Sequence, residues 1–252
     1  MLVFSADDFG KSEIANKNIL KLARLGKVQR VSVMVNGIIS GEEAKKLLNS
    51  RVNLDIHLEL PHLSSLGNAV AIPAKTGIRK KSSVFWIPVQ GRDDKKGVFS
   101  RSSWFILLFL INHTSTKKIE QLWDSQIKKF VNLFNKTPDG LNSHEHVHFF
   151  PPYFRIALKL CEKYKIKHIR FGEKGVIVRR NIIGWILSVL NWYNKRLMAY
   201  SLKLKAYAWL TSLDWIKDLD SFISDNNSNN TLEIVCHPER KKEFKELMGR
   251  RE

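Results

Sequence analysis

Short apolar segments alternate with amphipathic segments along the first sixty residues, and this order restricts the fold more than any other feature of the sequence. Residues 1–6, 28–36 and 53–60 are typical of buried strands, because each is short, apolar and followed by Asp, Gly or Pro. Between them, residues 12–27 and 40–50 show helical spacing, with serine at the start of each segment as an N-cap. Strands joined by helical crossovers run parallel, so the order predicts an α/β fold with a parallel sheet, open or closed.

The same order resumes in the second half of the chain after an interruption. Residues from about 62 to 115 are rich in Gly, Pro, Ser and charge, and we interpret them as a loop insertion of the kind that forms substrate walls. Helices are predicted at 117–134, 151–166 and 214–226, and strands at 141–150, 168–171 and 231–239. The sequence contains no internal repeat. We therefore expect a single domain, residues 1–252, that carries this insertion.

Charge and cysteine content indicate which partners and which cellular compartment suit the protein. The 42 Lys and Arg residues exceed the 24 Asp and Glu residues, and the formal charge of +18 attracts phosphates, anionic lipid or nucleic acid without identifying which. Two cysteines, Cys161 and Cys236, make no disulfide framework, so we expect a reducing cytoplasm. No segment reaches the roughly 20 apolar residues that span a bilayer, and the N-terminus is typical of a strand rather than a signal peptide.

Acidic and histidine side chains gather at the predicted strands. In parallel α/β folds the carboxyl ends of the strands meet at one rim, so residues distant in sequence converge there. The candidates for such a site are Asp7, Asp8, His57, His144, His146, His148 and His237.

The spacing of these candidates has consequences for where they point. In a strand, His144, His146 and His148 would share one face, whereas a helix would bring only His144 and His148 together. The flanking turn and prolines favour the strand. Adjacent strand residues face opposite sides, so Asp7 and Asp8 both reach the site only if the backbone turns there, which a nearby glycine permits.

Carboxylates and imidazoles together are the ligands of divalent metals such as Zn, Mg and Mn. A catalytic metal site uses about three protein ligands and leaves a position open for water. One Asp and two His satisfy that number, and the second Asp remains as a general base. Each feature alone also has a structural explanation, since paired Asp residues near Gly form solvated turns and histidines pack in cores. The same ligands would also serve another metal-dependent hydrolase, such as a phosphoesterase.

Four segments carry a resemblance to a known family: "FSADDFGKSEIANKNILKLARLGKVQRVSVMVNG", "DIHLEL", "NSHEHVHFFP" and "EIVCHPE". In order and spacing they resemble the YdjC-like carbohydrate deacetylases, which include diacetylchitooligosaccharide deacetylases and a hopanoid-associated branch. The resemblance covers almost the whole chain. It implies an irregular TIM-type (β/α) barrel related to the polysaccharide deacetylases. The implied activity is metal-dependent removal of an N-acetyl group from an amino sugar, either an oligosaccharide or a glycolipid.

The resemblance also implies roles for individual residues. Asp8, His57 and His144 match the ligands of one divalent ion (Mg, Zn or Mn), and Asp7 matches the general base. His237 matches an acid or oxyanion partner. We further expect His146, His148 and Arg170 to orient ligands or line the sugar site. The sequence departs from the family pattern at Asn142, where Asp is frequent, and at Glu239, where Gly is frequent.

A segment without acidic residues, 174–213, suggests a partner beyond the sugar. Its Trp and Tyr residues are mixed with Lys and Arg, a composition that fits an anionic membrane surface at the inner face and a lipid-linked substrate. The alternative is a pair of barrel helices with aromatic residues in the core. Nucleic-acid binding without catalysis is less favoured, because it would leave the Asp and His set unexplained. The oligomeric state stays open, with a homodimer as one alternative.

Overall fold

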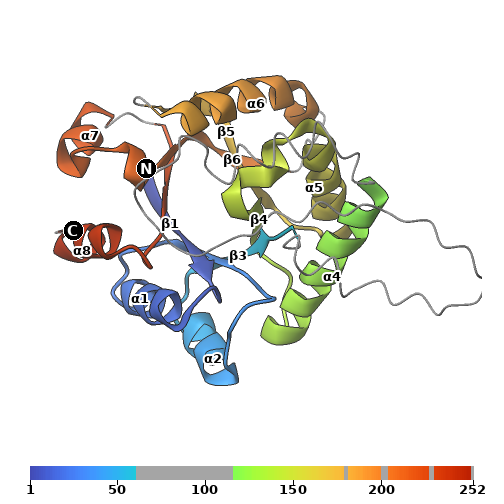
Figure 1. The fold of residues 1–252 in the computed structure, drawn as a ribbon, viewed down its shortest axis with the longest axis horizontal. Helices are drawn as coiled ribbons and strands as arrows, with labels where there is room; N and C mark the ends of the chain where they lie inside the picture. The colour runs from blue at the N-terminus through green and yellow to red at the C-terminus, as the bar shows by residue number, and fades with distance from the viewer. Residues whose placement is uncertain (61–115, 179–180, 200–203, 227–229, 251–252) are drawn as a thin grey trace, which may run out of the picture. The chain divides into compact units, whose positions relative to one another are not determined.

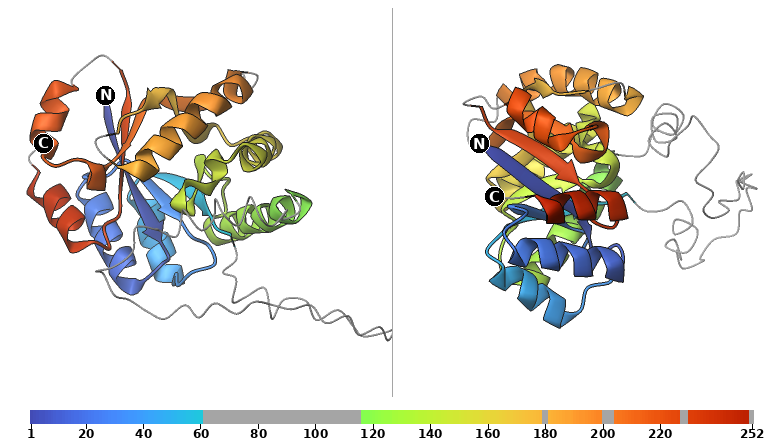
Figure 2. Two further views of the ribbon diagram at one scale, coloured as in Figure 1. Left: turned by 45° about the horizontal axis from the view of Figure 1, so that its top comes forward. Right: turned by 90° about the vertical axis from the view of Figure 1, so that its left-hand side faces the viewer.

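Seven parallel strands close into a barrel in the computed structural model, in the order β1-β2-β3-β4-β5-β6-β7. The structure describes residues 1–60, 116–178, 181–199, 204–226 and 230–250. Helices surround the strands on the outside (Figure 1, Figure 2). The chain is therefore the α/β barrel that the resemblance implied, and the predicted insertion at 62–115 lies outside the described residues.

The strands are β1 (Leu2–Phe9), β2 (Arg30–Val33), β3 (Asn53–Leu58), β4 (Gly140–Ser143), β5 (His168–Val176), β6 (Lys205–Ser212) and β7 (Leu232–Cys236). The helices are α1 (Glu13–Arg24), α2 (Gly41–Asn49), α4 (Thr116–Phe134), α5 (Pro151–Tyr164), α6 (Ile182–Ala199), α7 (Leu219–Asp225) and α8 (Lys241–Gly249). Two 3₁₀ turns, η1 (His144–Phe149) and η2 (Leu213–Trp215), follow β4 and β6.

The predicted N-caps are confirmed. The Ser12 hydroxyl accepts a hydrogen bond from the backbone N–H of Ala15, and the Ser40 hydroxyl accepts one from Glu43. The Glu43 side chain in turn accepts from the Ser40 backbone N–H, which completes a capping box. These caps satisfy amide groups that would otherwise lack a partner at the start of α1 and α2, so both helices begin where the sequence predicts.

Polar side chains fill the inside of the barrel. Strand residues alternate between the interior and the helix-facing side, so "RVSV" and "NLDIHL" place Arg30, Ser32, Asp55 and His57 inward. The guanidinium of Arg30 binds the Asp55 carboxylate in a buried ion pair, with Nε 2.8 Å from Oδ2. Gly140 leaves room for this pair, because a Cβ at that position would collide with both side chains. Apolar burial thus lies mainly between strands and helices rather than inside the barrel.

The prediction of a strand over residues 141–150 is wrong beyond Ser143. β4 ends there, and η1 follows with two residues in the left-handed region, Glu145 (φ 53°) and His146 (φ 55°). Such conformations cost non-glycine residues free energy and persist only where the surrounding structure imposes them. The histidines of this segment therefore do not share one strand face.

The alternative prediction that the segment 174–213 forms a pair of helices is also wrong. It forms the end of β5, the single helix α6 and the strand β6, with residues 179–180 and 200–203 outside the described part. The aromatic residues of this segment consequently divide between a helix and a strand.

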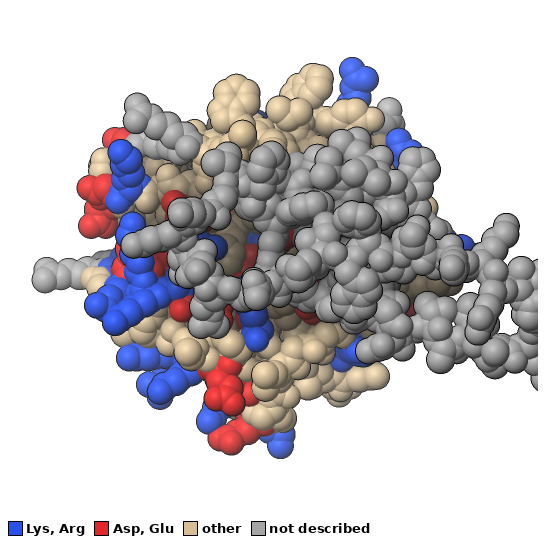
Figure 3. Space-filling view, in the orientation of Figure 1, with Lys and Arg blue, Asp and Glu red and all other residues tan. Residues whose placement is uncertain are grey.

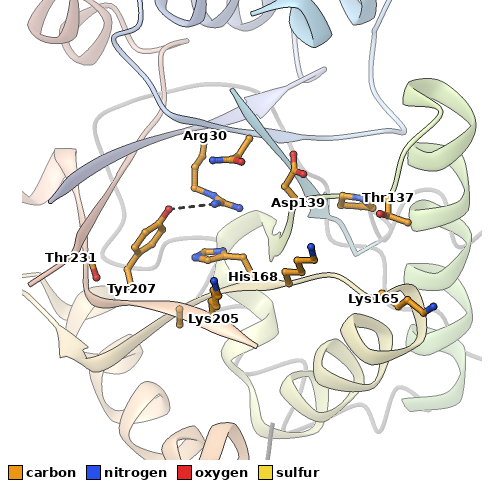
Figure 4. Close-up of a pocket in the computed structure, with 12 residues that line it drawn as sticks. Arg30, Thr137, Asp139, Lys165, His168, Lys205, Tyr207 and Thr231 are labelled. Atoms are coloured by element: carbon orange, nitrogen blue, oxygen red, sulfur yellow. Dashed lines mark hydrogen bonds between the residues drawn. The ribbon is translucent and has the colours of Figure 1, made fainter. Parts of the chain in front are cut away.

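A cavity of about 460 Å³ opens at the end of the barrel where the strands begin (Figure 4). Arg30, His168, Lys205 and Tyr207 are among its lining residues, and no residue of the predicted site lines it. The His168 ring contacts the Tyr207 ring, with centroids 4.7 Å apart. Neither nitrogen of His168 has a hydrogen-bond partner in the described part of the chain. Burial and the charge of Arg30 lower the pKa of His168 to about 3.

Because the pKa of His168 is low in the folded chain, we expect the stability of the fold to decrease in acid. Between pH 6.5 and pH 3 the unfolded chain binds a proton at His168 that the folded chain does not, so the free energy of unfolding falls as the pH falls. We expect His168→Phe to reduce this slope by up to about 1.4 kcal/mol per pH unit, and to change stability little at pH 7. Urea unfolding of both proteins across this pH range measures the difference. If the free energy of unfolding fell equally with pH in both proteins, His168 would not be the cause of the acid sensitivity.

Candidate metal centre

The two adjacent aspartates both lie inside the barrel because the backbone of β1 is irregular at Asp8. Asp8 has a left-handed φ of 73°, and the pairing of β1 with β2 shifts register between Ala6 and Phe9. Gly10 follows with φ 102°, and its amide donates to the buried side chain of Asn16 over 2.6 Å. The turn that the sequence required for both carboxylates to face one site is thus present, at Asp8 itself.

Three side chains, from β1, β3 and the start of η1, meet at one point. The Oδ1 atom of Asp8 lies 3.3 Å from Nε2 of His57 and 3.1 Å from Nδ1 of His144. One potential ligand atom from each of the three residues lies within 4.8 Å of the other two. Ligands that share a cation at about 2.1 Å are separated by roughly 3.0–3.4 Å, so these contacts fit a common ion.

The hydrogen bonds of His57 favour a metal ligand over a simple ion pair. Nδ1 of His57 contacts the side-chain oxygen of Asn142. Because this oxygen can only accept a hydrogen bond, Nδ1 carries the proton and donates it. The Asn142 amide nitrogen donates to the Ser32 hydroxyl over 2.8 Å, which fixes the orientation of the amide. Nε2 of His57 is buried and has no hydrogen-bond partner in the described part of the chain. A free nitrogen lone pair beside a carboxylate oxygen is the arrangement that a divalent cation satisfies.

The electrostatics of this cluster also favour positive charge. Burial alone would raise the pKa of Asp8, but the neighbouring imidazoles of His144 and His57 lower it far below its usual range. Burial likewise would lower the pKa of His57, but Asp7 and Asp8 outweigh burial and raise it. The carboxylates that favour a proton on His57 would favour a cation at the same place.

The carboxylate of Asp7 is held by Arg170 of β5. Two guanidinium nitrogens of Arg170 donate to the two oxygens of Asp7 over 2.6 and 2.8 Å. The Nε atom of Arg170 donates to Glu233 of β7 over 2.9 Å. Burial would raise the pKa of Asp7, but the charge of Arg170 lowers it below its usual range, so Asp7 is ionised. Arg170 thus crosses the barrel interior and orients one carboxylate of the aspartate pair.

His237 directly follows the last residue of β7, Cys236. Its backbone N–H donates to Glu243 of α8 over 2.6 Å, and its Nδ1 lies 3.8 Å from the same carboxylate oxygen. Burial would lower the pKa of His237, but Glu243, Asp7 and Asp8 raise it. The charge of His237 also contributes to the low pKa of Asp7, so the structure places this residue within electrostatic range of the aspartates.

The remaining histidines of η1 lie in different environments. His148 is fully buried, and its Nε2 is 3.0 Å from the carbonyl of Arg170, which can only accept. Its Nδ1 therefore accepts from the Ser143 hydroxyl over 2.7 Å, and burial lowers the pKa of His148 to about 3. His146 is half-buried, with its ring centroid 6.4 Å from that of His148. A neutral His148 thus ties η1 to β5, whereas the role predicted for His146 remains a prediction.

Two charged residues at the edge of this cluster were not predicted. The Nζ atom of Lys11 lies 2.9 Å from the second oxygen of Asp8 and 3.2 Å from Glu239. Glu239 also accepts a hydrogen bond from Ser12. The position of Lys11, three residues after Asp8 across a glycine turn, was the only signal in the sequence. Glu239 was noted only as a departure from the family pattern.

Comparisons with known proteins agree with this geometry. The family model of YdjC-like proteins matches residues 1–250. A carbohydrate deacetylase of Halalkalibacterium halodurans is 25% identical over 243 residues, which cover 94% of this chain and 84% of the relative. A chitooligosaccharide deacetylase of Salmonella schwarzengrund is 24% identical over 238 residues, with 94% and 81% covered.

A solved structure shares the fold. The crystal structure from Enterococcus faecalis V583, named for cellobiose-phosphate cleavage, superimposes with a TM-score of 0.58 at 18% identity, covering 94% of this chain and 80% of that one. At this identity the likeness shows the barrel alone. The match of the family model over nearly every residue, on a barrel that brings together the aspartate and histidine motifs, shows that the chain belongs to the YdjC-like protein family.

Proposed function

We propose that the protein is a metal-dependent hydrolase that removes an N-acetyl group from an amino sugar. The observation that carries this proposal is the cluster of Asp8 on β1, His57 on β3 and His144 at the start of η1, three potential ligands within 4.8 Å of one another. The names of the two relatives, carbohydrate deacetylase and chitooligosaccharide deacetylase, support the substrate class.

The three residues would hold one divalent cation, which when bound supplies Lewis-acid polarisation of the acetamide carbonyl and acidifies water. Two imidazoles and one carboxylate suit Zn or Mn, and the carboxylate-rich surroundings also accept Mg. Asn142 and Ser32 keep His57 in the tautomer that presents Nε2 to the cation. Lys11 binds the second oxygen of Asp8 and leaves the first oxygen for the shared position.

Asp7 and His237 are the proposed proton-transfer groups. Asp7 is ionised and held in one orientation by Arg170, which suits a group that accepts the proton of the attacking water, although the ion pair also lowers its basicity. The raised pKa of His237 favours its protonated form near neutral pH, so it can donate to the departing amine. Acetate and a free amino sugar are the products.

Acetate release from N-acetylated sugars tests the proposal. The protein is stripped with a chelator, reloaded with Mg, Mn or Zn, and incubated with N-acetylglucosamine oligosaccharides and with p-nitrophenyl phosphate. We expect acetate release that disappears with the chelator and returns with one of the metals. Release of phosphate without acetate from any N-acetylated sugar would instead indicate the phosphoesterase alternative.

Asn142 provides a separate test of the ligand assignment. Asn142→Leu removes the group that accepts from Nδ1 of His57, so His57 is free to turn or to change its tautomer. We expect metal affinity to fall by about 10- to 100-fold, as measured by isothermal titration calorimetry with Mn or Zn. Asn142→Asp retains an acceptor and is the control, with affinity close to that of the wild type. Equal affinity of the Leu variant would show that His57 is no ligand.

A further inference from the structure

Helix α6 exposes a continuous apolar stripe. Ile182, Trp185, Val189, Trp192 and Tyr193 are each more than half exposed, and they supply half of the large exposed apolar side chains in the described part of the chain. At 100° per residue they fall within an arc of about 100°. A tan region lies along the upper edge of the space-filling view, over α6 (Figure 3). Isolated exposed apolar residues are ordinary, but a stripe of this kind marks a contact surface.

The opposite side of α6 is partly polar, which reverses the usual pattern of a surface helix. The buried residues of α6 are Gly184, Leu187, Asn191 and Asn194. Two asparagines therefore face the protein while two tryptophans face away from it. Packing against the barrel does not explain this distribution, since the larger apolar surface is left outside.

Hydrogen bonds of the asparagines fix the rotation of the helix. The Asn191 side chain accepts from the backbone N–H of Gly172 over 3.0 Å and donates to the carbonyl of the same residue over 2.8 Å. Asn194 donates to the carbonyl of Phe149 over 2.6 Å. Turning the helix to bury Trp185 and Trp192 would leave these buried backbone groups without partners, at a cost comparable to several lost hydrogen bonds. The apolar stripe is thus held outward by the fold.

The charge around the stripe is positive. α6 contains no acidic residue, and Arg196 lies on the same arc, four residues after Trp192. Arg196 is exposed and has no acidic partner within the described part of the chain. Tryptophan, tyrosine and arginine on one helix face are the residues that occupy the boundary between acyl chains and anionic headgroups.

A second copy of the chain is a poorer occupant. An 18-residue helix is about 27 Å long and about 10 Å wide, so one face offers roughly 300 Å², against the roughly 800 Å² per partner of a standard interface. None of the described helices is long and apolar enough to cross a membrane, so α6 would lie in the surface rather than span it. We propose that α6 docks the protein on an anionic membrane through Ile182, Trp185, Val189, Trp192 and Tyr193, with Arg196 contacting lipid phosphates.

This placement bears on the substrate. α6 begins at the end of the barrel where β5 ends, and that is the end at which the strands present the proposed metal site. A membrane contact there would bring lipid-linked amino sugars to the site. The docking does not depend on the proposed hydrolysis, because it is measured by binding alone.

Vesicle co-sedimentation of the full chain tests the docking. We expect binding to phosphatidylcholine vesicles that contain phosphatidylglycerol, and weaker binding to pure phosphatidylcholine. Trp185→Ser with Trp192→Ser should abolish sedimentation, and Arg196→Gln should weaken binding to the anionic vesicles by about fivefold. The matched control is Ile14→Ser with Leu48→Ser, which removes exposed apolar residues from α1 and α2 and should leave binding unchanged.

Three results would overturn the proposal. The first is absence of sedimentation with either vesicle. The second is wild-type binding by the double tryptophan variant, which would place the contact elsewhere on this basic protein. The third is a dimer in light scattering that the tryptophan variant converts to a monomer, without vesicle binding by either protein. Circular dichroism confirms that the variant is folded.

Discussion

Replacement of Asp7 by Asn is expected to lower turnover by about 100- to 10,000-fold while metal binding is retained. The asparagine keeps the size of the side chain and an acceptor for Arg170, but it cannot take a proton from water. Arg170 retains its charge partner Glu233, so the barrel interior stays balanced. The proposed ligand Asp8 is unchanged in this variant and keeps its contacts with His57 and His144.

Two measurements are needed for this variant. Acetate release from an N-acetylated oligosaccharide gives the loss of turnover, and calorimetric titration with Mn or Zn gives the metal affinity. Asp8→Asn is the counterpart and should lose metal binding as well as activity, since it replaces a charged ligand. Full activity of the Asp7→Asn protein would show that another group, such as His237, accepts the proton.

Replacement of Arg170 by Met is expected to destabilise the fold by about 3–5 kcal/mol. Arg170 is fully buried and contacts both Asp7 and Glu233, so its loss leaves two carboxylates in the barrel without their shared cation. Part of the cost can be relieved when the carboxylates take up protons, so the loss should be smaller at low pH. Urea unfolding monitored by circular dichroism gives the free energy of unfolding.

The matched control for Arg170 is a cation at the surface. Lys163 pairs with Asp124 on the outside of the barrel and is about half exposed, so Lys163→Met should cost less than about 1 kcal/mol. If the two variants were equally stable, the ion pairs inside the barrel would contribute no more than surface pairs, and Arg170 would not be the residue that fixes Asp7.

Local patterns were sufficient to predict most strands and helices of the barrel and the caps of α1 and α2, but they did not predict the helix α6 followed by the strand β6. Ser12 and Ser40 have side chains that stabilise helix starts by contacts within three residues, so their effect can be read from neighbours in sequence. The strand positions of Asp7 and His57 followed from short apolar segments. The closure of the sheet into a barrel came only from the family resemblance, because alternating segments alone permit an open sheet.

The errors arose where distant residues decide local structure. "HEHVH" was predicted as strand because its neighbours favour extended backbone, but Glu145 and His146 adopt left-handed conformations within η1. Contacts of His148 with Ser143 and the Arg170 carbonyl hold that turn, and the second contact involves a strand that comes later in the sequence. No periodicity reports such a contact.

The polar residues inside the barrel could have been predicted more fully. Strands with Arg30, Ser32, Asp55, Asn142 and Glu233 at every second position indicate a barrel interior that is polar, and charge balance within it required cations opposite the carboxylates. The pairing itself, such as Arg170 with both Asp7 and Glu233, depends on which strands face each other across the barrel. That information is absent from the separate segments.

The position of a bound cation tests the account most directly. Crystals of the protein soaked in Mn²⁺ or Zn²⁺ give an anomalous difference map in which the metal is identified by its absorption edge. The account predicts a single strong peak in contact with Asp8 Oδ1, His57 Nε2 and His144 Nδ1. A map without a peak among these three atoms, at metal concentrations that support acetate release, would contradict it.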